Sequence, residues 1–152
     1  MVKSRVLLFF FLLLPALGQA QGKVDSLQNL LSRTTSDSLR ILLMIEINGA
    51  IEFQDIDKSK EYLDEAAQLA ETNDWDWARL KVYRAQSFAA VLVGDYSSSL
   101  RFDNQRLSLA AAAKDTAQIQ DALNYIGDTY QSLGEYDEAY FYFTKAYKLA
   151  QI

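Results

Sequence analysis

Hydrophobic residues recur three and four positions apart along most of the chain, and the segments with this spacing come in pairs joined by short turns. This spacing places apolar side chains on one face of an α-helix. The pattern therefore predicts an all-α protein made of about three helical hairpins. We expect the paired helices at 37–53 and 57–73, 76–92 and 95–114, and 116–132 and 135–151.

The three pairs are copies of one unit, because a shift of 40 residues brings like residues into register. A fixed repeat of this length indicates a stacked array in which each unit buries its apolar face against the next. The array is expected over 37–152, with units at about 37–75, 76–115 and 116–152. A lead-in segment over 21–36 contains a short helix near Val24 to Arg33. The matching positions include Asp55, Asp95 and Glu135; Tyr62, Phe102 and Tyr142; Ala50, Ala90 and Tyr130; and Ser59, Ser99 and Ala139.

Acidic residues mark the starts of the expected helices. Asp37, Asp57, Asp95 and Asp115 stand where a carboxylate can cap the backbone or favour the positive end of the helix dipole. Acidic pairs such as Asp137 and Glu138 need no further role, since no spacing places two carboxylates across a cleft for acid–base catalysis.

The third copy combines large apolar, small and turn residues at a fixed spacing: Leu123, Gly127, Tyr130, Gly134, Tyr136, Ala139, Phe143 and Ala146. At this spacing the copy resembles the signature of the tetratricopeptide repeat. The second copy departs at Ser87, Asp103 and Arg106, and the first at Ile47 and Gln54. The resemblance implies a superhelical array whose concave groove, lined by the first helix of each hairpin, binds a peptide or a protein segment.

Groove residues can be carried over by matching positions between copies. They are Met44, Asn48 and Ile51 in the first copy; Lys81, Arg84, Phe88 and Val91 in the second; and Asp121, Asn124, Asp128 and Gln131 in the third. Lys81 and Arg84 are three residues apart on one helix face, so they could hold a carboxylate between them, flanked by Asn48 and Asn124. The alternative is that both cations are simply solvated on an acidic surface.

The sequence NDWDWARL at 73–80 falls between the first two hairpins. Its two tryptophans could form a ligand platform. The alternative, which we favour, is that one tryptophan fills the gap between repeats while Asp74 or Asp76 caps the next helix.

The N-terminus reads as a secretory signal peptide over 1–20. Lys3 and Arg5 precede an apolar run from Val6 to Leu14, and Gly18-Gln19-Ala20 is a small-x-small cleavage site. The run is shorter than the roughly 20 residues that cross a bilayer, which argues against the alternative of an uncleaved anchor. We expect cleavage after Ala20 and a periplasmic or secreted protein.

The composition limits the chemistry. The sequence contains neither histidine nor cysteine, so it offers no Ser-His-Asp or Cys-His arrangement and no zinc site with those ligands. Its formal charge of -5 repels nucleic acid and anionic lipid on average. We expect no enzyme, no metal and no cofactor, but a protein or peptide partner.

The last helix carries more apolar surface than one core requires. From Tyr136 to Ala150 its aromatic and small residues cover about half the circumference, against a stripe of a little over 100° for a helix facing one core. We expect Tyr140, Tyr147 and Leu149 to be covered by a second copy, a partner helix or further residues. Two functions remain open. The first is a binding scaffold. The second is the sensory input region of a signalling protein truncated at Ile152, since the expected leader followed by these repeats is similar to the extracytoplasmic region of sensor kinases and response regulators.

Overall fold

The computed structural model describes residues 22–151, and within them every regular element is a helix. The expected signal peptide at 1–20 lies outside the described residues. After a helix over 22–33 come six helices that form three hairpins. Their bounds lie close to the ranges expected from the sequence, and the all-α repeat fold is confirmed. The helices are α2 (Asp37–Ile51), α3 (Ile56–Thr72), α4 (Asp76–Leu92), α5 (Tyr96–Ala113), α6 (Thr116–Leu133) and α7 (Tyr136–Leu149).

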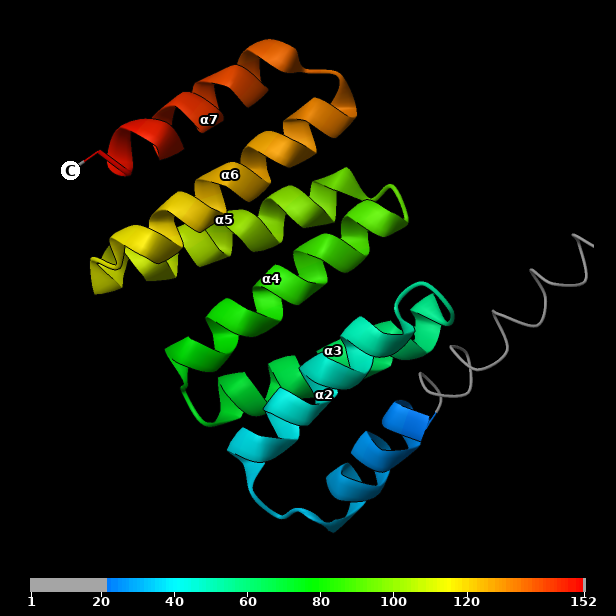
Figure 1. Ribbon diagram of the computed structural model, residues 1–152. Coiled ribbons are helices and arrows are strands. Elements are labelled where there is room, and N and C mark those ends of the chain that lie inside the picture. The colour runs from blue at the N-terminus through cyan, green and yellow to red at the C-terminus, as the bar shows by residue number, and fades with distance from the viewer. Residues whose placement is uncertain (1–21, 152) are drawn as a thin grey trace, which may run out of the picture.

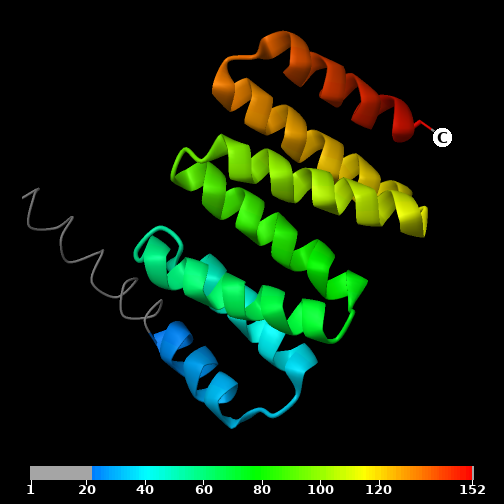
Figure 2. The ribbon, with the colours of Figure 1, turned by 180° about the vertical axis from the view of Figure 1, so that it is seen from behind.

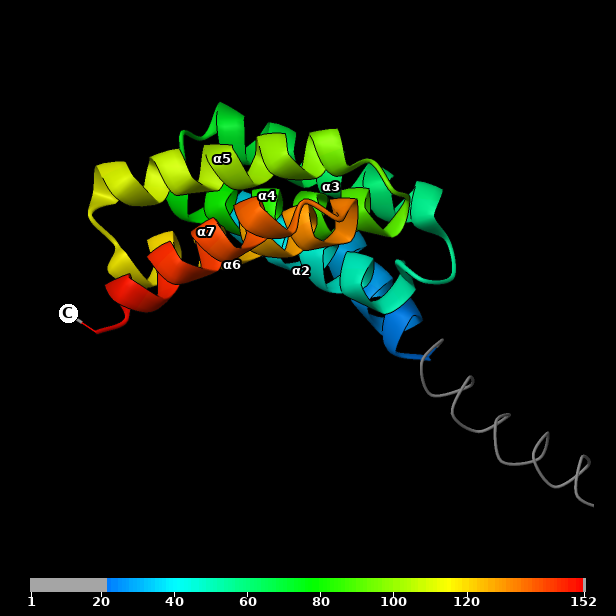
Figure 3. The same cartoon turned by 90° about the horizontal axis from the view of Figure 1, so that it is seen from above.

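The helices stack in chain order, each packed on the one before it (Figure 1, and from behind in Figure 2). Along the stack, α3 and α5 lie on one side, and α2 and α6 lie on the other (Figure 3). Besides these sequential contacts, α2 packs against α4. The array therefore has two different sides, one carrying α3 and α5 and the other carrying α2 and α6.

Side-chain caps and left-handed residues set the helix ends. Asp55, Asp95 and Asp115 each accept a hydrogen bond from a backbone N–H three residues on, which stabilises the start of α3, α5 and α6. Asp55 thus takes the capping role, while Asp57 lies in the first turn of α3. Gly134 ends α6 with a φ of 80°, a conformation that glycine adopts without strain.

Several signature residues of the third hairpin lie where α6 and α7 pack together. A Cβ added to Gly127 would lie 2.7 Å from the Phe143 ring, so only glycine lets α7 approach α6 this closely. Ala139 and Ala146 are buried in the same interface. Tyr136, by contrast, is 69% exposed and contributes little to the packing inside the hairpin.

The helix over 22–33 covers one side of the first hairpin. Val24 packs with Ile47 and Ile51 of α2, and the Gln28 amide donates a hydrogen bond to the Tyr62 hydroxyl of α3. This contact buries residues of α2 that would otherwise face solvent.

Candidate partner-binding surface

The predicted groove residues of the second and third hairpins lie on α4 and α6. Lys81 and Asp128 are exposed, and Phe88 and Asn124 are half-buried. Although Asp128 is exposed overall, partial burial of its carboxyl group raises its pKa above the ordinary value. These side chains, together with Arg84, offer both signs of charge to a partner on the face made by first helices.

Arg84 connects α4 to α6 instead of standing free beside Lys81. Its Nε and Nη2 atoms lie 3.1 and 3.0 Å from the Tyr125 hydroxyl, and its guanidinium lies 5.3 Å from the centre of that ring. The hydrogen bond to Tyr125 is the main cause that raises the Arg84 pKa. The side chain is 56% exposed, so some of its five donors still face solvent.

Tyr125 is a half-buried residue of this surface that sequence reasoning missed. The apolar spacing of α6 does not single it out, yet its hydroxyl accepts from Arg84 and its ring contacts two guanidinium groups. The signal that could have found it is its place four residues after Asp121 and one after Asn124, on a face that carries polar residues.

Asp121 links this surface to the interior. Its Oδ2 atom lies 3.8 Å from Arg84 Nε and accepts a hydrogen bond from Arg106, whose side chain is only 1% exposed. Arg106 also donates to Asp103 at 3.1 Å, while its buried Nε has no partner. A line of alternating charges therefore runs from the surface of α4 into the core of the second hairpin.

The buried carboxylate of Asp103 is held by neutral as well as charged groups. The Ser87 hydroxyl donates to it, and Ser87 is further connected through Ser99 to Thr129 of α6. Burial is the largest effect on Asp103 and raises its pKa to about 6, while the hydrogen bond from Ser87 and the charge of Arg106 act in the opposite direction. These contacts join the second hairpin to the third.

The first hairpin does not add the groove residues expected of it. Asn48 is only 3% exposed; its amide oxygen accepts from Ser59 and its nitrogen donates to Glu52. The expectation that Asn48 is a free flanking donor is therefore wrong in this structure. Met44 and Ile51 are buried as well, because α2 packs against α3, α4 and the helix over 22–33.

An aromatic contact lies beside the groove residues of α4. Phe88 of α4 meets Phe53 edge to face, with ring centres 6.2 Å apart, and Phe53 itself is 75% exposed in the turn after α2. This exposed ring gives the surface an apolar contact next to its charged residues.

In the tryptophan segment at 73–80, Trp75 packs against the core instead of forming an open ligand platform. Trp75 packs partly buried against the core of the first hairpin and stacks on Trp77. Neither Asp74 nor Asp76 caps α4; both pair with Arg79. Asp74 adopts a left-handed backbone with a φ of 53°.

The last helix exposes the rings of Tyr140 and Tyr147, and the expectation that a second copy, a partner helix or further residues cover them stays a prediction. Tyr140 and Tyr147 are 75% and 65% exposed, whereas Leu149 is half-buried and contributes less to this surface. Phe141 is also exposed, with Lys145 Nζ 4.3 Å from the centre of its ring. These rings lie on a different helix from the surface formed by α4 and α6, which we call the α4–α6 surface and which comprises Lys81, Arg84, Phe88, Asn124, Tyr125 and Asp128.

Comparison with known proteins agrees with this architecture. Residues 120–151 match the family model described as tetratricopeptide repeat. A Signal Transduction ATPase with Numerous Domains from Pyrococcus horikoshii, which has a tetratricopeptide repeat sensor, aligns with a TM-score of 0.75 at 17% identity; the alignment covers 86% of this chain and 21% of that one. The TPR domain of Arabidopsis FLU aligns with a TM-score of 0.68 at 15% identity, covering 76% and 98%. A search of curated proteins finds no match.

The chain has the fold of a tetratricopeptide-repeat array. This chain spans about a fifth of the first structural neighbour and nearly all of the second. The family match over 120–151 agrees with this fold, and tetratricopeptide-repeat domains in general bind protein partners. Their helical repeat fold is typically not catalytic.

Two further observations concern membranes and metals. None of the helices in the described part of the chain combines the length and the apolar content needed to span a bilayer. Among residues 22–151, no group of three or more acidic side chains is placed to hold a metal ion.

Proposed function

We propose that this protein is a binding scaffold that holds an acidic segment of a partner protein on the α4–α6 surface. The observation that carries the proposal is the cation pair on α4. Lys81 is exposed, and Arg84 is oriented by Tyr125 while more than half of its side chain stays accessible. A guanidinium that is already positioned loses less side-chain entropy when it binds a carboxylate.

The remaining groups on this surface would select the register of the partner. Phe53 and Phe88 offer an apolar contact at one end, and Asn124 offers an amide on α6. Asp128 would disfavour a partner carboxylate at its own end, so the acidic residue of the partner is expected nearer to Lys81. An acidic residue with an apolar neighbour is the simplest match.

We further propose that the protein acts outside the cytoplasm, as its N-terminal pattern predicts. A leader that is removed after Ala20 would leave Gln21 as the first residue. Cell fractionation with N-terminal sequencing tests this directly. A protein that stays in the cytoplasm with Met1 intact would contradict it.

A sensory role is the second candidate function. One structural neighbour is described as having a tetratricopeptide repeat sensor, and this chain covers a fifth of it. In such a protein the same α4–α6 surface would receive the signal and pass it to another module. Both candidates use the same binding surface, and they differ in whether binding only holds the partner or also changes the activity of that other module.

The binding proposal is tested by charge reversal. The variant Lys81→Glu, Arg84→Glu is compared with Lys58→Glu, Lys114→Glu, which changes the net charge equally at exposed sites on α3 and after α5. Partners captured by the wild type are identified and titrated by calorimetry against both variants. Loss of affinity only in the groove variant, with unchanged helicity, supports the proposal; equal affinity in both variants contradicts it.

A further inference from the structure

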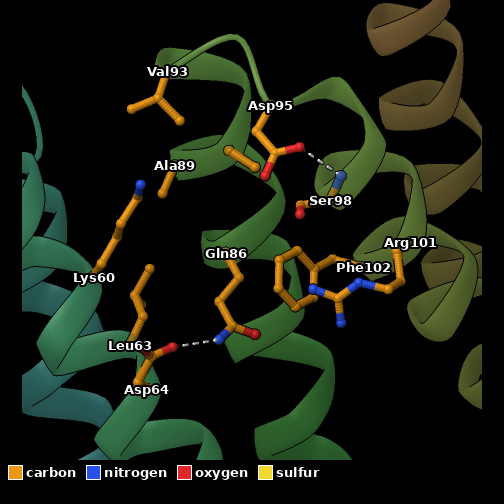
Figure 4. A pocket seen from close by; sticks show the side chains of 11 residues that line it. Lys60, Leu63, Asp64, Gln86, Ala89, Val93, Asp95, Ser98, Arg101 and Phe102 are labelled. Atoms are coloured by element: carbon orange, nitrogen blue, oxygen red, sulfur yellow. Dashed lines mark hydrogen bonds between the residues drawn. The ribbon is translucent and has the colours of Figure 1, made fainter.

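A hollow lies on the other face of the array, between α3 and α5 and above α4 (Figure 4). Leu63, Ala89, Ala90, Val93 and Phe102 form its apolar lining. The empty space among all the residues that line the hollow is about 500 Å³ and includes space open to solvent. Gln86 lies in its wall and is two residues from Arg84, which turns the two side chains to different sides of α4. The hollow is therefore distinct from the α4–α6 surface.

The third hairpin shows what occupies the corresponding place. Tyr130 takes the repeat position of Ala90, and its ring stacks on Tyr142 with centres 5.4 Å apart and planes 10° from parallel. Tyr142 takes the repeat position of Phe102. Phe102 stacks instead on Tyr83 of α4, with ring centres 6.2 Å apart. At the repeat position of Tyr130, α4 supplies only the methyl group of Ala90, which lines the hollow.

The wall of the hollow holds a polar atom without a partner. The Gln86 amide nitrogen donates to Asp64 at 3.3 Å, while the buried oxygen Oε1 accepts no hydrogen bond. A buried acceptor without a donor is unfavourable. A ligand that brings an N–H or O–H group, and that turns the Gln86 side chain toward it, would relieve this.

Two positively charged side chains lie at the rim of the hollow, one on α3 and one on α5. Lys60 of α3 and Arg101 of α5 are both exposed, and neither forms a salt bridge with another described residue. The Arg101 guanidinium lies 4.2 Å from the centre of the Phe102 ring. Asp64 and Asp95 also line the hollow. Asp64 accepts a hydrogen bond from Gln86, and Asp95 accepts one from the backbone N–H of Ser98 and feels the charges of Lys60 and Arg101. Both carboxylates thus already have hydrogen-bond donors, whereas the two cations can still pair with acidic groups of a ligand.

We propose that this hollow binds a tyrosine side chain presented by an acidic segment of a partner protein. The ring would occupy the space beside Ala90. In the third hairpin, the ring of Tyr130 stands at the corresponding repeat position. Its hydroxyl would donate to Gln86 Oε1, and acidic neighbours would pair with Lys60 and Arg101. A phenylalanine would fill the space but leave the Gln86 oxygen unpaired.

The proposal is tested with short peptides as probes in an NMR titration of the isotope-labelled chain. The probe Ac-Glu-Glu-Tyr-Glu-Glu-NH₂ is compared with versions that carry phenylalanine at the centre or lysine at the flanks. We expect chemical-shift changes at Ala89, Ala90 and Ser98, affinity about fivefold weaker for the phenylalanine peptide and at least about tenfold weaker for the lysine peptide. Absence of shift changes at these residues up to millimolar tyrosine peptide would overturn the proposal.

Variants separate the hollow from the other surfaces. Ala90→Tyr supplies the missing ring from the chain itself and should abolish binding without lowering the melting temperature; Ala90→Leu is the smaller replacement if that variant does not fold. Lys114→Glu, at an exposed site just after α5 that does not line the hollow, is the control and should bind the tyrosine peptide as the wild type does. Equal binding by Ala90→Tyr, or loss of binding in the control alone, would contradict the assignment to the hollow.

A second copy is the competing occupant, since α7 exposes Tyr136 and Tyr140 beside Asp137 and Glu138. Sedimentation of the protein alone decides between the two. A monomer agrees with a partner segment. Self-association that is lost in both Ala90→Tyr and Tyr140→Ala would show that the hollow binds another copy of this chain and would overturn the proposal of a separate partner.

Discussion

The Ser87 hydroxyl donates a hydrogen bond to the Asp103 carboxylate in the buried centre of the second hairpin. The same two repeat positions hold Gly127 and Phe143 in the third hairpin, where the ring lies against the glycine. One hairpin thus joins its helices by a polar pair and the other by close apolar packing. Arg106 extends the polar pair to Asp121 of α6, and from there the contacts reach the α4–α6 surface.

The first prediction concerns pH. The folded-state pKa of Asp103 is raised to about 6 from the ordinary 3.8. Between these two pH values the Asp103 carboxyl keeps its proton in the folded protein but releases it in the unfolded chain. The contribution of Asp103 to stability is therefore largest below about pH 4 and falls as pH rises toward 6, by about 3 kcal/mol at most. Urea unfolding of wild type and Asp103→Asn between pH 4 and pH 7.5 measures it. A stability difference that does not change with pH would contradict this prediction.

The second prediction concerns the buried charges. Arg106→Met removes the cation between two carboxylates, one of them fully buried, and should cost about 3–5 kcal/mol. Replacing the whole set by the residues of the third hairpin, with Ser87→Gly, Ser99→Ala, Asp103→Phe and Arg106→Ala, should instead leave stability unchanged or raise it by up to about 4 kcal/mol. Chemical denaturation of both variants tests this. A fourfold variant less stable than Arg106→Met would show that the polar set is not replaceable by apolar packing.

The third prediction uses two glycines as a matched pair. Gly127→Ala forces the Phe143 ring or α7 to move and should destabilise the protein by about 1–3 kcal/mol. Gly49→Ala lies within α2 where an added Cβ meets nothing within 4 Å, and it should stabilise by about 0.5–1 kcal/mol. Melting temperatures that shift in opposite directions bear this out. A destabilised Gly49→Ala would show that the exposed side of α2 is already packed.

The hairpins could be predicted from the sequence because apolar residues recur at helical spacing within each helix. The turns could be predicted because capping residues or glycine mark the ends of the helices. Gly134 ends α6 in the left-handed conformation, and Asp95 and Asp115 cap α5 and α6. These signals are local, so a single sequence reveals them.

The site was less predictable because exposure depends on neighbours. Asn48 and Lys81 were both selected by matching positions between copies, but Asn48 is buried by packing of the first hairpin that matched positions do not reveal. Asp103 and Arg106 stood out as departures from the repeat pattern. That they meet Ser87 and Asp121 depends on how α4, α5 and α6 come together, which local spacing does not specify.

The central claim is that partners bind the α4–α6 surface, and site-specific photocrosslinking in living cells tests it most directly. A photoreactive residue replaces Lys81 or Asp128 on that surface, and Ser32 or Lys114 as controls, since both are exposed and neither lines the hollow between α3 and α5. We predict one defined crosslinked protein from positions 81 and 128 and none from 32 and 114. Crosslinks from the two control positions alone, or the same product from all four, would contradict the account.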